Sequence, residues 1–162
     1  MSNEAYHKIP QPDELSERER DDAMGSYLMM FASVAIGLPL PIINLIAAIV
    51  YYFTNRSKGL FVHFHSLQSL ISQLPTTIIN AIGVYWGVRI YFFDWELTDT
   101  FKGYLIMAII FNLAYFVFSI VGAVKAKKGR MYYFLFFGRL SYEMVFKKKN
   151  VDESKIQNLP PQ

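Results

Sequence analysis

Polar and small side chains recur along one face of the second apolar stretch, and they are the chain's best candidates for chemistry. At about 100° per residue from His65, these positions fall near one line down a helix. We call this set the polar stripe: His65, Gln68, Ser69, Ser72, Gln73, Thr76, Asn80, Gly83 and Gly87. Small residues let helices approach in lipid, and amides bond across them. The stripe therefore predicts a helix-packing face or, as an alternative, a water-lined pore wall.

Two histidines near the start of this stretch raise the question of a metal site. His63 and His65 are about 200° apart on a helix, so their rings point to opposite faces. Metal ligands must converge on one ion, which these two do not. We therefore expect no metal site. An ordinary interfacial histidine is favoured for His65, which is the better candidate of the two for the alternative, a hydrogen-bonding or pH-sensitive group near the membrane interface.

The sequence contains no recognisable catalytic constellation. There is no cysteine, no phosphate-binding loop and no nucleophile beside a base. Asp94, Glu96 and Asp99 share one polar segment but have no histidine companion. We expect a protein that is not an enzyme and binds no cofactor.

Three asparagines fall inside otherwise apolar stretches. An isolated amide is costly in hydrocarbon, so Asn44, Asn80 and Asn112 should face protein or water rather than lipid. We predict that they converge in the interior of a helix bundle. With no charged residue beside them, a hydrogen-bonded structural cluster is favoured over a substrate site.

The elements that must position these residues are long apolar segments. The chain is 53% hydrophobic and 18% charged, and residues 23–54 and 103–124 contain no Asp, Glu, Lys or Arg. Such lengths are typical of membrane crossings. We predict an all-α integral membrane protein, a bundle of three to four transmembrane helices with spans at about 24–53, 74–93 and 103–124.

The first of these spans cannot be one straight crossing. About 30 residues would extend ~45 Å, against a hydrocarbon core of ~30 Å. Pro39 and Pro41 lie within it, and proline disrupts a helix interior. We predict a kink, or two short helices joined between Gly37 and Pro41.

The remaining segments are predicted to lie outside the hydrocarbon. Residues 1–22 form an acidic soluble segment, in which Ser16 and Glu19 are spaced as a helix-capping box. Within a membrane domain of residues 23–146, segments 60–73 and 131–146 are expected at the interface, the latter as an aromatic and basic helix. Residues 147–162 are expected to be basic and then disordered.

Basic residues gather toward the carboxyl terminus and suggest a lipid partner. The expected headgroup contacts are Lys125, Lys127, Lys128, Arg130, Lys147, Lys148 and Lys149. The positive-inside rule makes this tail cytoplasmic in a multi-pass protein of the cell membrane. Three crossings would put the amino terminus outside, whereas a hairpin in the first span would put both termini inside. Anionic lipids, rather than nucleic acid, are the expected partners of these bases.

Three groups of residues, in order along the chain, carry a family resemblance. They are Leu15, Ser16, Glu17, Arg18, Glu19 and Arg20; then Phe61, Val62, His65, Gln68, Leu70 and Gln73; then Ala123, Lys125, Ala126, Gly129, Tyr132 and Tyr133. Together they resemble a bacterial family of uncharacterised small multi-spanning membrane proteins, grouped with the twenty-kilodalton Tic subunit of the chloroplast inner-envelope import channel. The chain departs from that pattern at Ser69, where the family has alanine, and at Ile71, where it has asparagine. The resemblance implies three or four membrane helices and no enzymatic activity.

These observations lead to two functional hypotheses. The first is a non-enzymatic subunit or accessory of a larger membrane assembly, which contacts other membrane subunits or copies of itself. The second is a channel or protein-translocation element, with a pore lined by His65, Gln68, Ser72, Thr76 and Asn80.

Overall fold

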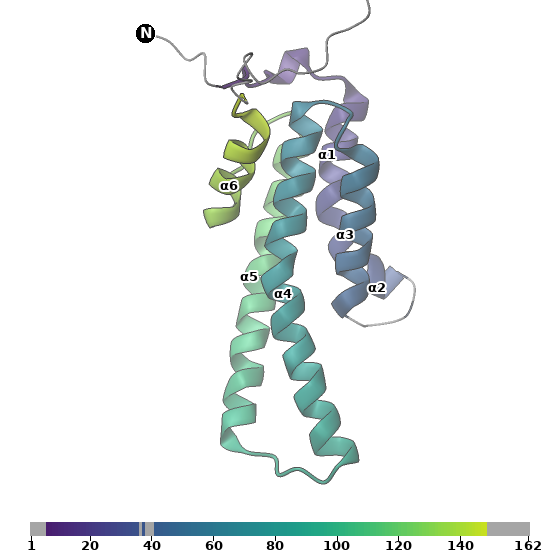
Figure 1. Ribbon diagram of the computed structural model, residues 1–162, viewed down its shortest axis with the longest axis vertical. Coiled ribbons are helices and arrows are strands. Elements are labelled where there is room, and N and C mark those ends of the chain that lie inside the picture. Colours follow the sequence, from purple (N-terminus) through teal and green to yellow (C-terminus); the bar gives the residue numbers. More distant parts are fainter. Residues whose placement is uncertain (1–5, 36, 38–40, 149–162) are drawn as a thin grey trace, which may run out of the picture.

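The computed structural model describes residues 6–35, 37 and 41–148, and these are predominantly helical (Figure 1). The α-helices are α1 (Glu17–Leu28), α2 (Ala32–Ala35), α3 (Pro41–Asn55), α4 (Leu60–Phe92), α5 (Asp99–Lys127) and α6 (Leu135–Phe146). Short 3-10 turns cover Pro12–Glu14 and Met29–Phe31. Within the described ranges there is no strand, only an isolated bridge between Tyr6 and Lys147. The all-helical architecture predicted from sequence is confirmed for these residues.

Helix α1 begins where the capping pattern places it. The Ser16 hydroxyl accepts a hydrogen bond from Glu19 N at 3.2 Å, and the Glu19 carboxylate accepts one from Ser16 N at 3.0 Å. This reciprocal box satisfies two backbone N–H groups at the helix start. The helix then runs across the boundary expected at residues 22 and 23, so the acidic residues after Ser16 belong to the packed bundle rather than to a separate segment.

The first apolar stretch is two helical pieces that fold back on each other. α1, the following 3-10 turn and α2 run in one direction, and α3 returns beside them (Figure 1). Pro41 is the first residue of α3, a position where its missing N–H costs no hydrogen bond. Pro39 lies outside the described residues. The stretch therefore has the two-helix form of the prediction.

Helices α4 and α5 form a long antiparallel hairpin. α4 has 33 residues, roughly 50 Å, and continues through Pro75 without interruption, so the expected interfacial and spanning segments are one helix. α5 begins at a Thr98 cap, whose hydroxyl accepts a bond from Phe101 N at 3.2 Å. Of the described helices, α5 alone combines the length and hydropathy of a membrane crossing, whereas α3 is apolar but shorter.

The segment after α5 runs back alongside α5 as far as Phe134, and α6 then runs in the opposite direction. Near the end of α5, Arg130 N donates to the Lys125 carbonyl at 3.0 Å. Phe134 already lies beside Tyr115 and Phe118, roughly two and a half to three turns before the end of α5. α6 then packs on α4, and its final residue, Phe146, accepts a backbone bond from His7 at 2.8 Å. Residues 149–162, predicted to be basic and disordered, lie outside the described residues.

The buried side chains are concentrated in one half of the molecule. In α4, every described buried residue lies between Phe61 and Thr77. We call residues 61–77 of α4, the end of α5 and the surrounding α1, α3 and α6 the packed half. The rest of α4 with the first part of α5 is the hairpin half, where the two helices extend beyond the others (Figure 1).

Candidate functional site: the polar interior

The amino-terminal part of the polar stripe forms a buried hydrogen-bond network. Tyr27 Oη lies 2.8 Å from His65 Nδ1 and accepts a bond from Gln68 Nε2 at 2.6 Å. The Gln68 Oε1 atom in turn accepts the backbone N–H of Phe134 at 3.1 Å. All three side chains are almost fully buried. The network thus joins α1, α4 and the segment before α6 through side chains whose polar groups would otherwise be unpaired.

Two serines of the stripe also bond to backbone carbonyls. Ser69 Oγ donates to the Ser26 carbonyl of α1 at 2.7 Å, and Ser72 Oγ donates to the Ser69 carbonyl at 2.9 Å. The hydroxyl of Ser69 therefore supports the contact between α1 and α4, whereas that of Ser72 stays within its own helix. In this part of the stripe, α1 and the carboxyl-terminal segment cover the polar side chains.

The two histidines point to different neighbours. His65 reaches Tyr27 of α1, whereas His63 Nε2 lies 3.1 Å from Tyr52 Oη of α3. In the described part of the chain, no group of three or more His, Cys, Asp or Glu side chains is placed to hold a metal ion. His65 lies in the packed interior, not at an exposed interface.

Further along α4 the stripe borders a small polar pocket of about 70 Å³. Gln73, Thr76 and Asn80 of α4 line it, together with Asn44 of α3 and Tyr115 of α5. Gln73 Oε1 and Thr76 Oγ1 are buried there without a hydrogen-bond partner. The pocket is too small for more than a few water-sized groups.

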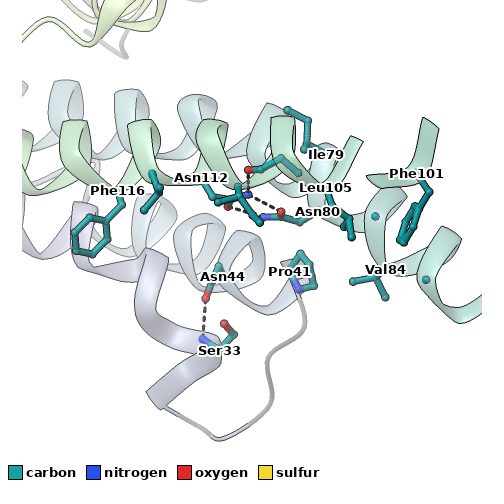
Figure 2. A pocket seen from close by; sticks show the side chains of 15 residues that line it. Ser33, Pro41, Asn44, Ile79, Asn80, Val84, Phe101, Leu105, Asn112 and Phe116 are labelled. Atoms are coloured by element: carbon teal, nitrogen blue, oxygen red, sulfur yellow. Dashed lines mark hydrogen bonds between the residues drawn. The ribbon is translucent and has the colours of Figure 1, made fainter. Parts of the chain in front are cut away.

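The pocket adjoins a larger open groove of about 740 Å³, which the three asparagines of the apolar stretches line (Figure 2). Asn80 and Asn112 form a reciprocal amide pair, with N–O distances of 2.9 and 2.8 Å. Asn44 instead accepts a bond from the backbone N of Ser33 at 2.7 Å. The other groove walls are mainly apolar side chains of α4 and α5, including Ile79, Val84, Leu105 and Phe116.

The glycines of the stripe face aromatic rings rather than a closely approaching backbone. A Cβ at Gly83 would lie 3.4 Å from Tyr104, and one at Gly87 would lie 3.9 Å from Phe101. Both are ordinary contact distances. A closer approach occurs outside the stripe at Gly122 of α5, where a Cβ would lie 2.8 Å from the Tyr27 ring.

Sequence reasoning about the stripe missed Tyr27, which is central to the network. Tyr27 lies four residues after Ala23, which is also buried, but a tyrosine near the start of an apolar stretch resembles an ordinary interfacial ring. The capping box at Ser16 indicated a helix that could include Tyr27, but it did not indicate which neighbour the ring would contact. The close approach of α1 to α5 at Gly122 depends on this tyrosine.

The basic residues near the carboxyl terminus differ in their exposure and in their ion-pair partners. Lys127, at the end of α5, forms ion pairs with Asp21 and Glu17 of α1. The hydrogen bond that Lys127 donates to the Asp21 carboxylate raises the pKa of Lys127 above its usual value. Lys125 is half-buried, whereas Lys128, Arg130, Lys147 and Lys148 are exposed; Lys149 lies outside the described residues. Lys127, one of the expected headgroup contacts, is thus paired with carboxylates of α1.

Residues 20–141 match the model of the magnetosome magnetite crystal formation protein family. This range begins in α1, ends in α6 and includes the network, the pocket and the groove. No curated protein and no solved structure matches the chain. The match fits the small membrane protein that the resemblance implied, but no comparison supports the grouping with the Tic subunit. The chain belongs to the magnetosome magnetite crystal formation protein family, a family of magnetosome membrane proteins.

Proposed function

We propose that this protein is a non-enzymatic subunit of a membrane assembly, with α4 and α5 crossing the bilayer. Family membership supports a membrane location in a crystal-forming compartment. The observation that carries the proposal is where the polar stripe makes its hydrogen bonds. Its buried members bond to α1 and to the segment before α6. These side chains hold the protein's own helices together.

The distribution of side chains along the hairpin supports this placement in the bilayer. Residues 103–124 of α5 contain no charged side chain and extend ~33 Å, close to the hydrocarbon thickness. At the loop end, Arg89 stacks on Trp95 and Phe93, with its guanidinium carbon 4.6 and 5.0 Å from the ring centroids. Aromatic rings beside a cation are typical of a membrane interface.

The other end of the hairpin has the character of a cytoplasmic surface. Arg56 and Lys58 lie in the turn before α4, and Lys128 and Arg130 follow α5. The positive-inside rule therefore favours this end as cytoplasmic. Because the Lys127–Asp21 pair joins α1 to the same end, we propose that both described ends of the chain are on that side.

The channel alternative receives less support from this geometry. A pore along the stripe would require its hydroxyls and amides to face a continuous aqueous path. His65, Gln68 and Ser69 are at most 2% exposed, and neighbouring helices cover them. The polar pocket beside Thr76 is small and borders an apolar groove.

Cysteine accessibility tests the proposed placement directly, because the chain has no native cysteine. Single variants Glu96→Cys and Lys148→Cys, probed in sealed vesicles with a membrane-impermeant thiol reagent, should be labelled from opposite sides. The unsubstituted chain, which has no thiol, controls for background labelling. Labelling of both cysteines from the same side would refute the crossing by α4 and α5.

The state of the protein in mild detergent tests the assembly role. Tagged protein extracted from its native membrane should migrate on a native gel as a species larger than one chain with its micelle. Light scattering gives the protein mass of that species. A single chain under every gentle extraction would contradict the role of subunit.

A further inference from the structure

We infer that the protein is a wedge within the bilayer, broad in the cytoplasmic leaflet and narrow in the opposite one, and that it favours membranes whose cytoplasmic leaflet is convex. This inference rests on the placement proposed above. It adds a function that packing alone does not require, namely the recognition or promotion of membrane curvature. The partner is the lipid bilayer itself.

The broad end is the packed half. There, α1, α3 and α6 lie around α4 and α5 (Figure 1), and contacts join each of them to this hairpin. α3 has 15 residues, about 22 Å, which is too short to cross the hydrocarbon but sufficient for one leaflet. Its first turn lies near the Asn80–Asn112 pair, because Pro41 and Asn44 line the same groove as these amides.

The position of that amide pair sets the depth at which the extra helices stop. Asn112 lies near the middle of the uncharged part of α5, nine residues after Gly103 and twelve before Val124. Helix α3 and the α1–α2 piece therefore reach about the bilayer midplane and turn back. The segment before α6 turns back as well, beside Tyr115 and Phe118.

The narrow end is the hairpin half, where both α4 and α5 expose apolar side chains. Ile106, Met107, Ile109 and Ile110 of α5 are 44–63% exposed although they are nearly consecutive. At about 100° per residue they span roughly 160° of the surface of α5. Helix α4 exposes apolar side chains as well, among them Ile82. A protein partner would cover one face, whereas acyl chains cover every face. Lipid is thus the occupant that this pattern fits.

The difference in cross-section between the two leaflets is substantial. A helix about 10 Å wide occupies roughly 80 Å² in the membrane plane. Three additional helices in one leaflet therefore displace on the order of 240 Å² more lipid area than the hairpin does in the other. Bending the membrane so that the leaflet holding the broad end becomes convex relieves this mismatch in area.

Helix α6 contributes to the broad end through its outer face. Phe136, Leu140 and Met144 are spaced by four residues and are 87%, 49% and 60% exposed. They form one apolar ridge, and Arg139 and Glu143 pair with each other beside it at 3.2 Å. This amphipathic pattern is that of a helix in the headgroup and upper acyl region.

Tubes pulled from giant vesicles test the inference, with full-length protein in phosphatidylcholine and phosphatidylglycerol. An impermeant fluorescent thiol reagent added outside labels Lys148→Cys only where the broad end faces outward, and Glu96→Cys only where the narrow end does. We expect the first population to be severalfold enriched on the tube, whose outer leaflet is convex, and the second to be depleted. Equal density of each population on tube and vesicle would overturn the wedge.

Two further outcomes distinguish a failure of the wedge from a failure of the proposed crossing by α4 and α5. If the Lys148→Cys and Glu96→Cys variants are labelled from the same side of the vesicle, α4 and α5 do not cross the bilayer, and the wedge is refuted together with the crossing. If the crossing holds but Ile110→Cys forms disulfide-linked dimers at high lipid dilution, a second copy covers the narrow end and the wedge is refuted. Absence of such dimers together with opposite sorting supports it.

A variant pair tests the contribution of α6. Phe136→Asp places a charge on the most exposed ring of the ridge and should release α6 from the leaflet, reducing the enrichment of the Lys148→Cys population on tubes. Phe136→Leu keeps the apolar ridge and should retain the enrichment. Equal enrichment in both variants would overturn the inclusion of α6 in the broad end. Since the Phe136 ring has few internal contacts, neither change should unfold the bundle.

Discussion

The two halves of α4 invert the relation between polarity and burial that is usual in soluble proteins. In the packed half the helix is rich in serine, glutamine and histidine, and these side chains are buried. In the hairpin half Ile78, Ile82 and Val84 are 46–58% exposed. Water as solvent would favour the opposite arrangement. The comparison supports the proposed placement in lipid, a solvent in which polar side chains gain by turning inward to other protein groups.

The two halves also differ in what holds the helices together. In the packed half, hydrogen bonds join side chains of one element to side chains or backbone of another, and Tyr27 fits against Gly122. In the hairpin half the described contacts between α4 and α5 are mainly rings, the Asn80–Asn112 pair and the bond from Tyr104 Oη to the Ile79 carbonyl. Substitutions in the packed half should therefore have the larger effects on stability.

The largest effect is expected when the buried network loses its central amide. Gln68→Leu removes the donor to Tyr27 and the acceptor for Phe134 N, leaving one buried N–H unpaired and one hydroxyl less well satisfied. We expect a loss of about 2–4 kcal/mol in the free energy of unfolding. Unfolding by sodium dodecyl sulfate in mixed micelles measures it. Ile82→Leu, exposed in the hairpin half, is the matched control and should change little; equal losses would remove the contrast between the halves.

A smaller loss is expected from crowding between α1 and α5. Gly122→Ala places a methyl group 2.8 Å from the Tyr27 ring, so the ring or the helix must shift. Overpacking of this kind costs about 1–3 kcal/mol, which the same titration resolves. Gly103→Ala has nothing within 4 Å and should be neutral or stabilising, because alanine favours helix. A neutral result at Gly122 would show that α1 and α5 are not closely packed.

The amide pair offers a test within the hairpin half. Asn80→Leu leaves Asn112 with only its bond to the Ala108 carbonyl, whereas the double change to leucine removes both amides. We expect a coupling of about 0.6–1.7 kcal/mol in a double-mutant cycle, the range measured between membrane helices. Additive single effects would show that the two amides do not pair in the membrane.

The sequence was sufficient to predict the helical class and the cap at Ser16, because apolar length and capping chemistry are local properties. It also predicted a break near Pro41. It could not predict the path of the segment after α5, because that path depends on Gln68 accepting a bond from Phe134, 66 residues away. Periodicity likewise placed the stripe on one face but did not distinguish its two parts. Which neighbour covers a face is a tertiary property.

The smallest predicted effect concerns the pocket where the two halves meet. Thr76 Oγ1 is buried without a partner, so Thr76→Val removes an unsatisfied hydroxyl while keeping the shape of the side chain. We expect stability to be unchanged or to rise by less than ~1 kcal/mol, since only an unpaired polar group is lost. Ser69→Ala is the matched control, because its hydroxyl bonds to the Ser26 carbonyl and its removal should destabilise. A clear destabilisation by Thr76→Val would mean that a small polar molecule bonds to this hydroxyl in the pocket, and that the boundary between the halves is hydrated rather than dry.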